Sequence, residues 1–131
     1  MSLVGLLNPV NSSWAKDAAA LVIVFSKMSR MAPGAKQETP AYNHSFDAGA
    51  AWASLALQAT RSGWQAHCMA GFDRTRAASE LLMPEGYRVE AAVAIGKPGD
   101  KAQLSEELQA REIPSLRNPL SAIAFEGMFP R

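Results

Sequence analysis

SFDAGAAWASLALQATRSGWQAHCMAGF, residues 45–72, contains the longest helix-forming run of this 131-residue chain. Apolar or small side chains occupy almost every side of a helical projection of its first part, apart from one narrow polar stripe. A helix that is apolar all round is a buried helix. Ser45 is a suitable N-cap, and Gly63 can adopt the left-handed conformation that ends a helix. The stretch therefore predicts a central, buried helix over residues 45–63.

The composition predicts one globular domain of near-neutral net charge spanning residues 1–131. Thirteen basic residues balance twelve acidic residues and are dispersed, which argues against a nucleic acid or a membrane surface as partner. The longest apolar run, residues 18–25, is too short to cross a bilayer, and the N-terminus lacks the plan of a signal peptide. Cys68 is the only cysteine, so an internal disulfide is excluded. We expect a soluble, cytoplasmic protein.

Two apolar runs predict the strands of the core. Residues 18–25, AAALVIVF, are rich in β-branched side chains without alternation, which is typical of a central strand buried on both faces. Residues 87–96, YRVEAAVAIG, alternate at first and then become wholly apolar, which predicts a second central strand. Residues 65–72 form either a short strand or an extended loop. Residues 27–44 have no hydrophobic period and predict a long loop, of the kind that often acts as a lid.

The remaining segments predict two further helices and an arm. Asp73 should cap a helix that stops at the turn of residues 84–86, and Asp100 should cap another helix through about Ala110. The tail, residues 113–131, combines three prolines with seven large apolar side chains. Such a segment is a poor helix and too apolar to be solvated, so we expect it to lie extended against a large surface, such as a second subunit.

Residue patterns typical of metal sites and of catalytic nucleophiles are absent. One cysteine with two histidines, of which His67 is its direct neighbour, has no zinc spacing. Cys68 is better explained as an inert buried side chain than as a nucleophile. Residues 96–101, GKPGDK, follow a strand but lack the spacing of a phosphate-binding loop. The sequence therefore predicts no metal ligand and no catalytic side chain.

Four short motifs, taken in order, resemble those of the flavin-dependent nitroreductase family from about Asn11 onward. They are Asp-Ala-Gly at 47–49, Met-Ala-Gly-Phe-Asp at 69–73, Pro-Glu-Gly-Tyr at 84–87 and Arg-Asn-Pro-Leu at 117–120. The resemblance implies an α+β fold, a truncated three-layer α/β/α sandwich with a long central dimer helix and an extended C-terminal arm. It also implies a homodimer formed through the helix of residues 45–63 and through the arm.

The resemblance implies an FMN-dependent oxidoreductase that transfers electrons from NAD(P)H to a nitroaromatic, a quinone or a similar flat acceptor. The backbone N–H groups of Ala70 and Gly71 would then donate to the edge of the flavin, and Met69 would pack against its ring. Arg117 is similar in position to a residue that grips the FMN phosphate, a task suited to a guanidinium group. Tyr42 is our candidate for stacking on the acceptor.

The chain departs from the family pattern at its N-terminus. The family's N-terminal helical portion, with its arginine- and serine-rich motif for the FMN phosphate, has no counterpart before Asn8. Without the resemblance, residues 69–72 would be interpreted as a tight connection and Arg117 as a surface side chain. The alternative function is therefore a non-catalytic dimerisation or binding module that keeps the nitroreductase core without a working flavin site.

Overall fold

The computed structural model describes residues 2–129, which form two compact units divided after Pro98. The first unit contains the sheet and the helices that cover it. The second unit contains a 3-10 helix η2 (Lys101–Gln103), the helix α4 (Glu106–Arg111) and a 3-10 helix η3 (Leu120–Ala122). Whether the two units behave as one domain stays a prediction.

Three antiparallel strands make the sheet of the first unit, in the order β1 (Ala20–Lys27), β5 (Tyr87–Gly96) and β4 (Gln65–Met69). The bounds of β5 agree with the prediction, and this strand is central. The prediction that the first apolar run is a central strand is wrong for the described sheet, because β1 lies at its edge. An apolar run indicates that both faces of a strand are covered by other elements, but it does not indicate whether the strand pairs with one neighbouring strand or with two.

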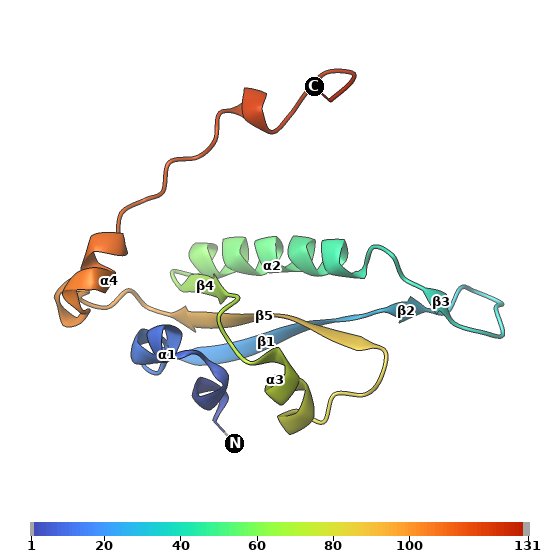
Figure 1. Ribbon diagram of the computed structural model, residues 1–131, viewed down its shortest axis with the longest axis horizontal. Helices are drawn as coiled ribbons and strands as arrows, with labels where there is room; N and C mark the ends of the chain where they lie inside the picture. Colours follow the sequence, from blue (N-terminus) through green and yellow to red (C-terminus); the bar gives the residue numbers. More distant parts are fainter. Residues whose placement is uncertain (1, 130–131) are drawn as a thin grey trace. The chain divides into compact units, whose positions relative to one another are not determined.

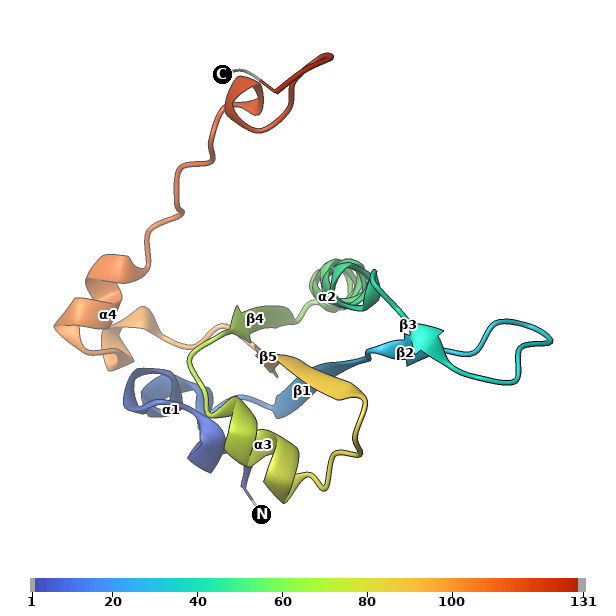
Figure 2. The same cartoon turned by 45° about the vertical axis from the view of Figure 1, so that its right-hand side comes forward.

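Helices cover both faces of this sheet (Figure 1). The helix α2 (His44–Arg61) lies on one face, and α1 (Pro9–Ala15) and α3 (Arg74–Glu80) lie on the other with the 3-10 helix η1 (Leu3–Leu6). The turned view of Figure 2 shows the same three layers. The predicted three-layer α/β/α arrangement is confirmed. The core lies mainly between the sheet and the second group of helices, and its buried side chains are Leu6, Ala15, Met69, Phe72, Ala77, Val89, Ala92 and Ala94.

The prediction that α2 is buried is wrong for the single chain. None of its residues is buried, and Phe46 and Leu57 are 79% and 69% exposed. Only one side of α2 packs on the sheet, and within the first unit, residues 2–98, no element covers the apolar side chains of its other side. The N-cap is Asn43 rather than Ser45, whose hydroxyl is bonded to the sheet instead. Gly63 ends the helix region with φ 73°, as predicted.

The segment predicted as a loop over residues 27–44 contains a small hairpin. Its strands are β2 (Ser29–Arg30) and β3 (Thr39–Pro40), which pair antiparallel. The side chains of Lys27 and Ser29 both donate to the Glu38 carboxylate, and this contact raises the pKa of Lys27 and lowers that of Glu38. Cross-strand polar pairs of this kind leave no hydrophobic pattern, so the hairpin is not visible in the sequence.

Capping determines where the remaining helices start. The Asp73 carboxylate accepts from the N–H of Arg76 at 2.9 Å, which confirms the predicted start of α3. Asp100 caps the 3-10 turn η2 instead of a longer helix, and Ser105 caps α4 separately. Residues 113–129 contain no α-helix, in agreement with the predicted arm. The arm's last two predicted residues, 130–131, lie outside the described part of the chain.

Candidate functional site

The loop that follows β4 is held by the N-terminal segment of the chain. Phe72 forms an isolated antiparallel bridge with Leu7, and the Asp73 N–H donates to the carbonyl of Leu6 at 2.9 Å. The N–H of Asn8 donates to the carbonyl of Gly71 at 3.0 Å. These three contacts join parts of the sequence that are more than sixty residues apart, and they fix the backbone of the loop.

Asn8 and Asn11 enclose Gly71 from the side of α1. Asn8 caps α1, its side chain accepting from the Asn11 N–H at 2.8 Å, and the Asn11 side-chain amide donates to the Gly71 carbonyl at 3.0 Å. A Cβ atom at Gly71 would lie 2.3 Å from the Asn8 Nδ2 and 2.8 Å from the Asn11 Nδ2. Position 71 therefore requires glycine because of close approach, and the conformation of its backbone is not the reason.

The backbone N–H of Gly71 is a free donor of this loop in the described part of the chain. The Phe72 N–H donates to the Ala70 carbonyl at 3.1 Å, which closes a tight turn around Gly71. In a trans peptide the N–H points opposite to the carbonyl of the preceding residue, so the Gly71 N–H is directed away from the turn. Within residues 2–129 the Gly71 N–H has no acceptor, and Gly71 is half-buried while Ala70 is exposed. The loop thus presents a fixed, unused hydrogen-bond donor next to the small side chain of Ala70.

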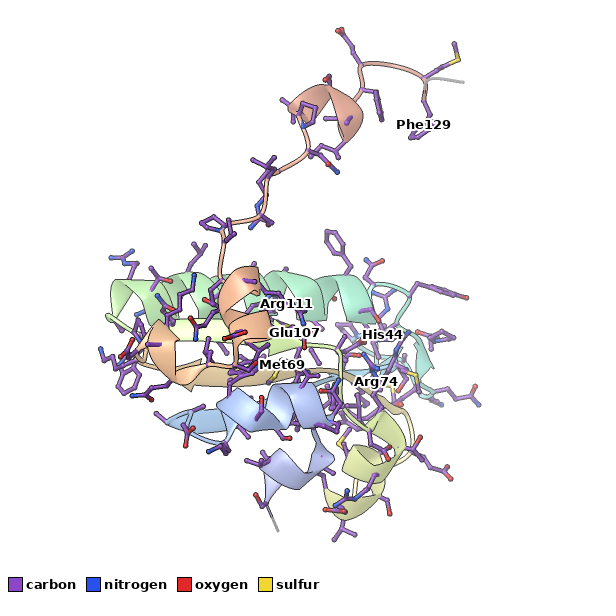
Figure 3. All side chains as sticks on the ribbon, turned by 60° about the vertical axis from the view of Figure 1, so that its left-hand side comes forward. His44, Met69, Arg74, Glu107, Arg111 and Phe129 are labelled. Atoms are coloured by element: carbon purple, nitrogen blue, oxygen red, sulfur yellow. The ribbon has the colours of Figure 1, made fainter. Side chains whose placement is uncertain are left out.

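The side chain of Met69 belongs to the core. It is 3% exposed and lies between the sheet and the N-terminal helices, where it packs with Leu6 and Phe72 (Figure 3). Met69, Ala70 and Gly71 are consecutive in the chain and therefore lie together. In the single chain the buried side chain of Met69 anchors the start of this loop in the core. Its contact with a flavin ring stays a prediction.

The other two predicted site residues lie elsewhere. Tyr42 follows β3, directly before α2, and its side chain is 90% exposed. Arg117 belongs to the second unit, where its guanidinium donates to the Ser115 hydroxyl at 3.0 Å. Both side chains are exposed, as a ligand contact requires, and their roles stay predictions.

Sequence reasoning missed Asn8 and Asn11. The Asn8-Pro9 pair is a recognisable helix start, with a side-chain cap followed by proline at the first helical position. This signal predicts α1 but not its contact with Gly71, because that contact depends on how the chain returns through β4.

The described residues offer little for metal or thiol chemistry. None of them forms a group of three or more His, Cys, Asp or Glu side chains suited to a metal ion. Burial raises the pKa of the Cys68 thiol, which disfavours the reactive thiolate. None of the helices within residues 2–129 combines the length and apolar character needed to cross a bilayer.

Comparison with known proteins gives clear relatives, although no protein-family model matches the chain. An uncharacterised 15.4 kDa protein from the ask 5′ region of Mycolicibacterium smegmatis is 39% identical over 127 residues, which cover 96% of this chain and 81% of that protein. The crystal structure of an oxidoreductase containing FMN is 46% identical, covers 97% of this chain and has a TM-score of 0.91. A nitroreductase family protein from Streptococcus pneumoniae shares the fold at 17% identity, with a TM-score of 0.68 over 95% of this chain and 72% of that one.

The chain is thus related to the nitroreductase family. Its fold is that of the family, and its structural neighbours are FMN-containing oxidoreductases and nitroreductases. The chain spans 64% of the length of the FMN-containing oxidoreductase.

Proposed function

We propose that this chain is an FMN-dependent oxidoreductase of the nitroreductase type, which transfers electrons from NAD(P)H to a nitroaromatic, a quinone or a similar flat acceptor. The observation that carries the proposal is the 46% identity and TM-score of 0.91, over 97% of the chain, to an oxidoreductase that contains FMN. Identity at this level, unlike the 17% shared with the pneumococcal protein, extends to side chains as well as to fold.

The loop of residues 69–72 fits the edge of a flavin. Bound FMN supplies hydride acceptance from NAD(P)H and electron delivery to the acceptor. The free N–H of Gly71 offers the hydrogen bond that a ring nitrogen at the flavin edge requires, and the backbone N–H of Ala70 would be the second donor. Asn8 and Asn11 hold the Gly71 carbonyl, so the donor is oriented before a ligand arrives. A preorganised donor of this kind loses little entropy on binding.

The remaining roles concern the ends of the ligand. Arg117 would bind the FMN phosphate through its guanidinium fork, and Tyr42 would stack on a flat acceptor. In such a reaction the protein places two flat rings against each other and excludes water, so it needs no acid–base side chain of its own.

We also propose that the working unit is a homodimer. The outer side of α2 exposes Phe46 and Leu57, and an open apolar groove of about 430 Å³ lies between α2 and the edge of the sheet. The arm adds further exposed apolar side chains: Ile113, Leu116, Leu120, Ile123, Phe125, Met128 and Phe129. Apolar surface distributed over a helix face and an arm is typical of a self-complementary interface.

The test is a titration of the 131-residue chain with FMN, followed by flavin fluorescence. We expect saturable binding and an NAD(P)H oxidation that depends on added FMN. Arg117→Ala should weaken FMN binding about tenfold, the loss expected for one charge-assisted phosphate contact. Arg111→Ala, an arginine of the same unit without a proposed role, is the matched control and should bind FMN normally.

The opposite results are equally informative. An absence of FMN binding and of FMN-dependent oxidation in a dimeric, folded chain would refute the enzyme and would support the non-catalytic dimerisation module. Equal losses in Arg117→Ala and Arg111→Ala would refute the specific role of Arg117, because both substitutions remove one positive charge.

A further inference from the structure

A compact polar cluster, separate from the loop of residues 69–72, joins three elements of the first unit. Ser26 of β1 and Ser45 of α2 both donate to the same oxygen of Glu90 of β5, at 2.7 Å each. The Ser26 hydroxyl also lies 2.8 Å from the Nδ1 of His44, the first residue of α2 (Figure 3). Ser26 is 8% exposed, and the side chains of His44 and Glu90 are 17% exposed. Side chains so little exposed need partners, and here each has one.

A β-bulge puts Glu90 in this position. In the pairing of β1 with β5, Val24 faces Ala91 and Phe25 faces Val89. Glu90 is therefore the extra residue, which has no paired residue on β1. Bulges re-aim side chains and are positioned features of a fold rather than defects. Here the bulge coincides with the one carboxylate of β5, and that carboxylate bonds to the first turn of α2.

The positions of the serine hydroxyl protons determine whether the Nδ1 of His44 donates or accepts a hydrogen bond. Both serines donate their single hydroxyl proton to the Glu90 carboxylate. The Ser26 oxygen can therefore only accept a hydrogen bond from His44. The Nδ1 of His44 therefore carries a proton. This arrangement also excludes a Ser–His–Glu nucleophilic triad, because in a triad the imidazole accepts the serine proton and the carboxylate holds the other nitrogen.

The charges around Glu90 favour its ionised form. Its second oxygen lies 3.6 Å from the Nε of Arg88, and the Nδ1 of His44 lies 3.6 Å from the first oxygen. On α3, Arg74 donates to the Glu90 backbone carbonyl at 3.5 Å, and Asp47 is the acidic residue in the first turn of α2. Burial opposes ionisation, but the hydrogen bonds from the two serines, the charge of Arg88 and a smaller contribution from His44 outweigh it, so the pKa of Glu90 is lowered.

We propose that Ser26, His44, Ser45 and Glu90 form a clasp that fixes the first turn of α2, and with it the end of the hairpin segment, to the sheet, and that releases it when Glu90 loses its charge. The N-cap residue Asn43 makes no side-chain cap bond, so this helix end lacks the usual local anchor. The carboxylate of the clasp sits where the helix dipole favours negative charge. The proposal does not depend on flavin binding.

The test compares hydrogen-exchange protection factors in the full chain at pH 7. In Glu90→Gln we expect protection of the first hydrogen-bonded amides of α2, residues 47–50, to fall about tenfold, since hydrogen bonds to a charged group are the stronger ones. Protection in the last turn of α2 and in β4 should not change. Glu85→Gln, an exposed glutamate in the turn before β5, is the matched control and should behave like the unaltered chain.

Two further measurements keep the proposal falsifiable. Ser26→Ala, which removes one hydroxyl, should lower the same protection by a smaller factor while the fold persists. Long-range ¹⁵N–¹H NMR should find a proton on the Nδ1 of His44. Unchanged first-turn protection in both Glu90→Gln and Ser26→Ala, or an unprotonated Nδ1, would overturn the clasp. A uniform loss of protection over the whole first unit would overturn it as a local device.

Discussion

Gly71→Ala is the substitution whose effect the structure specifies most closely. The new Cβ atom would lie 2.3 Å from the Asn8 Nδ2 and 2.8 Å from the Asn11 Nδ2, and real Cβ atoms do not occupy such distances. Asn8 cannot move without loss, because its side chain caps α1 through the Asn11 N–H. Asn11 cannot move without losing its bond to the Gly71 carbonyl.

The magnitude follows from these two contacts. Loss of the α1 cap costs about 1 kcal/mol. Loss of the Asn11 bond to the carbonyl costs about 1 kcal/mol. We therefore expect Gly71→Ala to lower the free energy of unfolding by about 2 kcal/mol, which is a large fraction of the stability of a small domain. The assay is urea unfolding followed by tryptophan fluorescence at a fixed protein concentration, because self-association would shift the apparent stability.

A double-mutant cycle distinguishes the specific clash with Asn8 from a general destabilisation by any side chain at position 71. In an Asn8→Ala background the closest clash is absent and the cap is already lost, so Gly71→Ala should cost about 1 kcal/mol less than in the unaltered chain. Gly99→Ala, where a Cβ meets nothing within 4 Å, is the control and should be nearly neutral. Equal costs of Gly71→Ala in the two backgrounds would refute the proposed contact.

Four other substitutions test separate features. Asp73→Ala removes the cap of α3 and should lower the free energy of unfolding by about 1 kcal/mol in the same urea assay. Gly49→Ala lies in the interior of α2 with nothing within 4 Å, so it should raise stability by about 0.5–1 kcal/mol, and a loss would show that this position is enclosed. Phe46→Ser on the outer side of α2 should weaken dimerisation in light scattering, whereas Leu82→Ser, equally exposed but outside α2, should not. Because the pKa of Glu90 is lowered in the fold, its contribution is complete above the ordinary value of 4.5 and disappears as the pH falls below it, so Glu90→Gln should flatten the loss of stability measured between pH 5 and pH 3.

Local patterns in the sequence were sufficient for several elements. The bounds of β5, the capped start of α3 at Asp73 and the end of α2 at Gly63 were all predicted from short windows. Each depends on interactions between residues a few positions apart, such as a cap, a left-handed glycine or an apolar period. The order of four short motifs also identified the family, since it samples the whole chain at once.

The candidate site was predicted only in part. The sequence left residues 65–72 open between a short strand and an extended loop, and the structure shows the strand β4 followed by the loop. The free donor at Gly71 depends on hydrogen bonds from Asn8 and Asn11. Those residues lie about sixty positions earlier, and nothing in their local sequence refers to position 71. The Glu90 carboxylate was missed for a related reason, because a single-residue bulge reverses the face on which a side chain lies.

The sequence by itself therefore determined the segments that form α2, β1 and β5 and the start of α3, and it indicated the nitroreductase family, because local periods, caps and motif order specify these properties. Only the tertiary structure decided which strand lies at the edge, that α2 exposes an apolar side in the single chain, and why position 71 must be glycine. These properties are set by contacts between distant segments, and a residue's type records that it is apolar or small without recording which neighbour requires it to be so.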